Sequence, residues 1–171
     1  MPVWLRLSIA GAASLLVGMG IGRFSYSLLI PVLIDAGHLT AAEAGSVGAS
    51  NFFGYLVGAL VAPWLRGRWG EVSSLRICLA VALVCLVASI APWGFVWLAF
   101  WRFLVGAAIG VMMIYSLAIV TRVAPPQKLG AATGIVFTGV GVAILMAAVL
   151  VPWLLTIGIA AAWTGLAAIG G

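Results

Sequence analysis

Two arginines lie inside long apolar segments of this 171-residue sequence, where a permanent cation is costly. Arg23, in "GMGIGRFSYS", is the only charged residue between Leu7 and Ile34, and Arg102 lies within a later apolar segment. A charge at the centre of a bilayer costs at least about 2.5–3.5 kcal/mol on insertion scales, so each arginine needs a compensating interaction. The chemistry that these residues could perform is contact with an anionic or strongly polar solute.

Uncharged polar residues accompany the two arginines. At helical spacing, Arg23 shares a face with Tyr26, and Asn51 shares a face with Tyr55. A rise of 1.5 Å per residue places Arg23 about 16 Å from the outer end of its segment, and Asn51 and Arg102 about 10 Å from theirs. One polar layer therefore lies between the midplane and the outer surface. It predicts a central cavity whose substrate-binding residues are Arg23, Tyr26, Asn51, Tyr55 and Arg102.

Other roles for these side chains stay open from the residues alone. The arginines could cap backbone carbonyls, extend to the outer interface, or bond Asn51 and tyrosines. Asn51 and Tyr55 could serve hydrogen bonding between helices. No Asp or Glu lies within an apolar segment, where it could pair with the arginines. Asp35 and Glu43 lie at the outer ends of these segments.

Residues with the usual catalytic or metal-binding chemistry are scarce. His38 is the single histidine, and the sequence has no H-E-x-x-H or G-x-S-x-G motif. "GMGIG" lacks the G-x-G-x-x-G spacing and the strand context of a dinucleotide site. Cys78 and Cys85 are expected to be small packing residues. We therefore predict that the protein is not an enzyme and has no metal site and no cofactor.

Composition assigns the chain to a membrane. It is 65% hydrophobic and 6% charged, whereas a soluble domain carries about 25% charged residues. The net charge of +5 does not indicate nucleic-acid binding, because the basic residues are scattered between apolar segments. The lipid bilayer is the expected surrounding, and no nucleic acid is expected as a partner.

Six apolar segments are suited to crossing a bilayer, which takes about 20 residues each. The predicted spans are 7–34, 44–65, 73–91, 95–120, 129–153 and an incomplete sixth at 160–171, with a polar basic loop, "RGRWGEVSSLR", after the second. The sequence thus predicts an all-α membrane protein: one transmembrane domain over residues 1–171, a polytopic helical bundle whose sixth helix is truncated. We expect it to be a fragment of a longer protein.

Basic residues are distributed asymmetrically about these spans. The loops expected on one side, 35–43, 92–94 and 154–159, contain no lysine or arginine, while the other side holds Arg6, Arg66, Arg68, Arg76, Arg122 and Lys128. The positive-inside rule then predicts a cytoplasmic N-terminus. We expect an integral protein of the bacterial inner membrane.

Small residues recur at four-residue spacing on four of the spans. Glycines at this spacing let helix backbones approach closely. The predicted packing pairs are Gly18 and Gly22, Gly54 and Gly58, Gly106 and Gly110, and Gly130 and Gly134.

The segments "GIGRFSYSLLIPVL", "ASNFFGYLVGALVAP", "WRFLVGAAIG" and "GIVFTGVGVAI" carry a resemblance to a known family. In order and spacing the chain resembles the N-terminal six-helix half of a major facilitator superfamily (MFS) transporter, of the YbfB/YjiJ-like branch. The resemblance implies alternating access, with substrate held between two halves near the midplane.

The motifs of that superfamily match this chain unevenly. Arg102 and Gly106 match an arginine–glycine pattern whose arginine is often tied to proton coupling or substrate response. The loop motif between the second and third spans is represented by Arg66, Arg68 and Gly70, but Ala62 occupies the position of its acid.

Our leading hypothesis is a secondary active transporter for a small polar or anionic solute, acting together with a missing C-terminal half. The alternative is a non-transporting membrane scaffold or assembly subunit that uses its Gly-x3-Gly faces to bind partner helices. A membrane-embedded enzyme would need a reactive acid, base or nucleophile at depth, which the spans do not offer.

We predict that a His38→Cys variant reacts with a membrane-impermeant maleimide in intact cells. An Arg68→Cys variant should react only after permeabilisation, because basic loops stay cytoplasmic. Both are made in a Cys78→Ala, Cys85→Ala background. The reverse labelling pattern would place the N-terminus outside.

Overall fold

The computed structural model describes residues 1–91, 93–158 and 164. Within these residues five helices are long and apolar enough to cross a bilayer, and no strand occurs among them. The predicted class, a polytopic helical membrane protein, is confirmed. The sixth span, predicted at 160–171, lies outside the described residues except for Thr164.

The first span is one continuous helical rod of three parts. Helix α1 (Val3–Leu15) passes into the π-helical segment η1 (Leu16–Phe24) and then into α2 (Ser25–Asp35). Single-turn π-bulges inside α-helices are often found at functional sites, and here Arg23 lies near the end of a longer π-helical segment.

The second span, α3 (Ala41–Trp69), begins at a capping box. The hydroxyl of Thr40 accepts from the backbone N–H of Glu43, and the Glu43 carboxylate accepts from the backbone N–H of Thr40 at 2.8 Å. Both otherwise unsatisfied donors at the helix start are thus bonded. The helix therefore starts three residues before the predicted span.

The prediction of a polar loop after the second span is wrong. Helix α4 (Glu71–Ala88) begins directly after Gly70, so the basic residues Arg66 and Arg68 occupy the last turn of α3. Gly70 adopts φ 75°, a left-handed conformation that glycine enters without steric cost. One residue therefore reverses the chain where a longer loop was expected.

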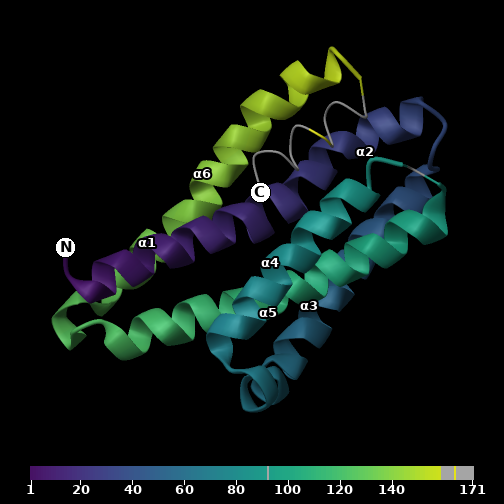
Figure 1. Ribbon diagram of the computed structural model, residues 1–171. Coiled ribbons are helices and arrows are strands. Elements are labelled where there is room, and N and C mark those ends of the chain that lie inside the picture. Colours follow the sequence, from purple (N-terminus) through teal and green to yellow (C-terminus); the bar gives the residue numbers. More distant parts are fainter. Residues whose placement is uncertain (92, 159–163, 165–171) are drawn as a thin grey trace.

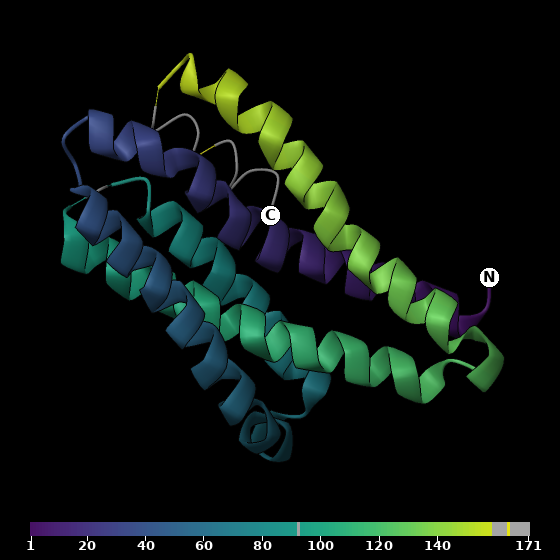
Figure 2. The ribbon, with the colours of Figure 1, turned by 180° about the vertical axis from the view of Figure 1, so that it is seen from behind.

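The remaining spans are α5 (Phe95–Val123) and α6 (Leu129–Leu155), joined through the short helix η2 (Pro126–Lys128). Figure 1 shows α6 running beside the first span, while α3, α4 and α5 form a second group. From behind, Figure 2 shows the N-terminus beside the α5–α6 connection. The α3–α4 corner lies toward this end of the bundle, and the α2–α3 and α4–α5 connections lie at the other.

Helices α3 and α5 touch backbone to backbone. A Cβ atom added at Gly54 would overlap the carbonyl oxygen of Phe103, and one added at Gly58 would overlap that of Ala107. On α3 these two positions therefore require glycine.

The glycines of α5 face the same contact from the other side. A Cβ at Gly106 would overlap the carbonyl oxygen of Asn51, and a Cβ at Gly110 would overlap that of Tyr55. On each helix the two glycines lie about one turn apart, so the two backbones stay in contact over more than one turn.

The other predicted glycines differ in their surroundings. Gly18 faces the flexible side chain of Met112, while Gly130 and Gly134 have no atom within 4 Å of an added Cβ. Gly22 lies in η1, and its neighbours are outside what the structure describes. A glycine not predicted as a packing residue, Gly139, meets the backbone of Ala12 and lets α6 approach α1.

We predict that Gly58→Ala lowers the free energy of unfolding by about 1–3 kcal/mol, because α3 and α5 must separate to admit the methyl group. The matched control is Gly45→Ala on the same helix, where the added Cβ meets nothing within 4 Å. That variant should be stabilised by up to about 1 kcal/mol. Unfolding in detergent micelles measures both, and equal effects of the two substitutions would contradict the close contact.

Candidate functional site

A small cavity lies where the first span, α3 and α5 meet. Its volume is about 90 Å³, and its walls carry two cationic side chains from two different spans. The lining residues are Arg23, Tyr26, Ser27, Gly48, Asn51, Phe52 and Arg102. The structure thus brings together four of the five residues predicted to bind substrate, with Tyr55 next to them.

Arg102 is the most enclosed of these residues, with 1% of its surface exposed. Its Nη2 donates to the hydroxyl of Ser89 at 2.8 Å. The guanidinium carbon also lies 5.9 Å from the centroid of the Tyr26 ring, within the range of a cation–π contact. The side chain is therefore held from two sides while it borders the cavity.

Arg23 is partly buried and rests on aromatic rings. Its guanidinium carbon lies 4.2 Å from the centroid of Phe52 and 5.5 Å from that of Tyr55. Ring faces attract a cation but impose less directional constraint than a hydrogen bond to oxygen. Both arginines therefore border the same cavity, Arg102 with a hydrogen bond to Ser89 and Arg23 over two aromatic rings.

Asn51 and Tyr26 contribute to the helix packing as well as to the cavity. The amide Nδ2 of Asn51 donates to the backbone oxygen of Arg102 at 2.8 Å, so it bonds the neighbouring helix and not the guanidinium. The Tyr26 hydroxyl donates to the carbonyl of Ala44 at 3.2 Å. Both bonds join two helices, which is the alternative role considered for Asn51 from the sequence.

Among the described contacts of the two arginines, two residues were not predicted. Phe52 supplies the ring beneath Arg23, and Ser89 supplies the acceptor for Arg102. Phe52 follows Asn51 directly, and helical periodicity places neighbouring residues on different faces of a helix. Ser89 lies at the end of α4, and nothing in its local sequence links it to a residue thirteen positions later.

The described residues that line the cavity include two cations and no carboxylate. Among the described residues no group of three or more His, Cys, Asp or Glu side chains could hold a metal ion. Arginine N–H groups and the Asn51 amide are hydrogen-bond donors, which match the oxygens of an anion. The arrangement is therefore suited to binding an oxyanion.

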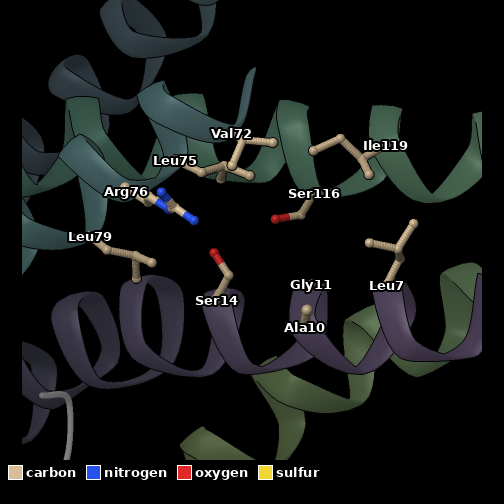
Figure 3. A pocket seen from close by; sticks show the side chains of 10 residues that line it. All are labelled: Leu7, Ala10, Gly11, Ser14, Val72, Leu75, Arg76, Leu79, Ser116 and Ile119. Carbon is tan, nitrogen blue, oxygen red and sulfur yellow. The ribbon is translucent and has the colours of Figure 1, made fainter. Parts of the chain in front are cut away.

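A second, larger cavity of about 260 Å³ lies between α1, α4 and α5. Figure 3 shows the hydroxyls of Ser14 and Ser116 pointing toward one another, with the Arg76 side chain directed between the helices. The remaining lining is aliphatic, formed by side chains such as Leu7, Leu79 and Ile119. One cation among aliphatic groups makes this cavity a weaker candidate for a polar solute.

At the end of the bundle near the N-terminus, Glu71 joins three helix ends. Its carboxylate lies 3.2 Å from Nε of Arg66 at the end of α3 and also pairs with Arg122 at the end of α5. Arg68 is exposed nearby. Ala62 stands where the loop motif has its acid, and the acid that pairs with Arg66 and Arg122 in this chain is Glu71.

Spanning helices that place two arginines around a small cavity define a polytopic membrane protein with an intramembrane polar site. A narrower classification comes from comparison with known families. Residues 15–171 match the family described as "Uncharacterised MFS-type transporter YbfB", and the chain belongs to this family. It is an integral membrane protein of the MFS type.

A curated relative is named "Probable anion transporter 6, chloroplastic", from Arabidopsis thaliana. The two are 29% identical over 153 residues, which cover 86% of this chain and 29% of the relative. The chain therefore spans less than a third of the length of the curated relative it matches.

We predict a coupling free energy of about 0.5–1 kcal/mol between Glu71 and Arg122 in a double-mutant cycle of Glu71→Gln and Arg122→Gln, because both arginines of the cluster are half exposed. The control cycle pairs Glu71→Gln with Arg76→Gln, and additivity is expected there. Unfolding in detergent micelles measures each free energy. Additivity in the first cycle would contradict an ion pair that joins α4 to α5.

Proposed function

We propose that this chain is the N-terminal bundle of a secondary transporter that moves a small anionic or strongly polar solute by alternating access. The observation that carries the proposal is the cavity where Arg23 and Arg102, from two spans, meet Asn51, with no carboxylate among the lining residues that the structure describes. Intramembrane cations facing a cavity mark substrate pathways in membrane proteins. The name of the plant relative, an anion transporter, agrees with this charge.

The second half of the transporter is the expected partner. In transporters of this build the solute is held near the midplane between two halves that rock against one another. The exposed apolar residues Phe53, Leu56 and Leu60 on α3 and Leu145 and Val149 on α6 would then face either the second half or lipid. The 90 Å³ cavity would be one wall of the complete site.

We also propose that the N-terminus is cytoplasmic and that the membrane is a bacterial inner membrane. The support is the position of the basic residues together with the fold. Arg66 and Arg122 are in the last turns of α3 and α5, and Lys128 is in the α5–α6 connection. These helix ends lie toward the same end of the bundle as the N-terminus (Figure 1). The positive-inside rule places that end in the cytoplasm.

The scaffold alternative has less support. Gly54, Gly58, Gly106 and Gly110 are occupied by the contact between α3 and α5, so they offer no open face to a partner helix. Gly130 and Gly134 on α6 do have open surroundings, but a second transporter half would cover them equally well. Membership of a transporter family also argues against an enzyme.

We predict that Arg102→Gln raises the KM for anion uptake at least about tenfold in proteoliposomes of the transporter with both halves present, as expected for loss of a hydrogen bond to a charged group. Arg23→Gln should have a smaller effect in the same direction. Labelled phosphate, sulfate and succinate serve as probes, with glucose as the uncharged comparison. The control is Arg6→Gln, an exposed arginine near the start of α1.

Anion uptake that is unchanged in both cavity variants would remove the arginines from the substrate site. Uptake of glucose alone would contradict the anionic class of the solute.

A further inference from the structure

Ser89 makes a hydrogen-bonded link between α4 and the candidate anion site. Its side chain is fully buried at the C-terminal end of α4. The hydroxyl donates its one proton to the carbonyl of Cys85 at 2.7 Å, and its oxygen accepts from Nη2 of Arg102 at 2.8 Å. Because the proton is committed to Cys85, the oxygen lone pairs are directed at the guanidinium.

The end of α4 is itself fixed relative to α5. The indole Nε1 of Trp97, in the first turn of α5, donates to the carbonyl of Ala88 at 3.0 Å. Cys85 and Leu86 are fully buried in the same region. The oxygen of Ser89 is therefore held at a set position relative to the helix that carries Arg102.

Ser89 does not line the cavity, whose walls come from the first span, α3 and α5. It can act on a bound solute only through Arg102. Unlike a carboxylate, a hydroxyl orients a cation without adding a negative charge. An aspartate at the same place would orient the guanidinium and also compete with an anionic solute for its charge.

We propose that Ser89 is a positioning residue that fixes the Arg102 guanidinium at the cavity and leaves its charge to the solute. Arg102 is then the anchored arginine of the cavity. The part of the inference that concerns the solute rests on the proposed function. The part that concerns the position of Arg102 does not.

The test measures the rate at which 2,3-butanedione, an arginine-selective reagent, modifies Arg102 in the protein in lipid nanodiscs, read by peptide mass spectrometry. Ser89→Ala should make the modification about tenfold faster, because the released guanidinium samples more positions. The matched control is Ser50→Ala, since the Ser50 hydroxyl also joins two helices, at 2.7 Å to the carbonyl of Ala99, without touching the guanidinium. That variant should react at the wild-type rate.

The same measurement with added sulfate separates the two parts of the inference. Sulfate should slow modification in the wild type, and Ser89→Asp should abolish this protection because its carboxylate takes the place of the anion. Equal modification rates in the wild type and Ser89→Ala would overturn the positioning role. Protection by sulfate that persists in Ser89→Asp would overturn the argument from charge.

Faster modification in Ser89→Ala without sulfate protection in the wild type would refute sulfate-like anions as ligands of the proposed transporter and leave the positioning role standing. Thermal unfolding of each variant checks that its fold is retained.

Discussion

The backbone contact between α3 and α5 is the constraint on which the site depends. Four glycines remove the Cβ atoms that would hold the two helices apart. Only at this separation can the Asn51 amide reach the backbone oxygen of Arg102, and Ser50 reach that of Ala99. Close packing of small residues and hydrogen bonds across helices act together here, as expected where lipid gives no hydrophobic driving force between helices.

The same contact explains how a chain with few polar residues can bury an arginine. The backbone oxygen of Arg102 accepts from Asn51 across this contact, and its guanidinium lies against Ser89 and the ring of Tyr26. Arg23 comes from the π-helical part of the first span and lies on aromatic faces. Two spans thus each bring one arginine to the same cavity.

The sequence alone predicted the membrane class, the family and the order of the spans, because these depend on long apolar segments and local motifs. It placed Arg23, Tyr26, Asn51 and Arg102 in one layer by counting helical rise, and these residues share a cavity. It missed Ser89 and Phe52, since no local pattern encodes which side chain a distant helix presents. The single-residue turn at Gly70 was also missed, because polar and basic residues there suggested a loop although both helices continue through them.

The most direct test of the central claim is anomalous diffraction from crystals of the protein grown with selenate. Selenate carries an anomalous scatterer in a tetrahedral oxyanion, so its position can be located without assumptions about transport. We expect a selenium peak in the cavity bordered by Arg23, Asn51 and Arg102. A selenate ion bound elsewhere in the protein, with this cavity empty, would contradict an anion site at the two arginines.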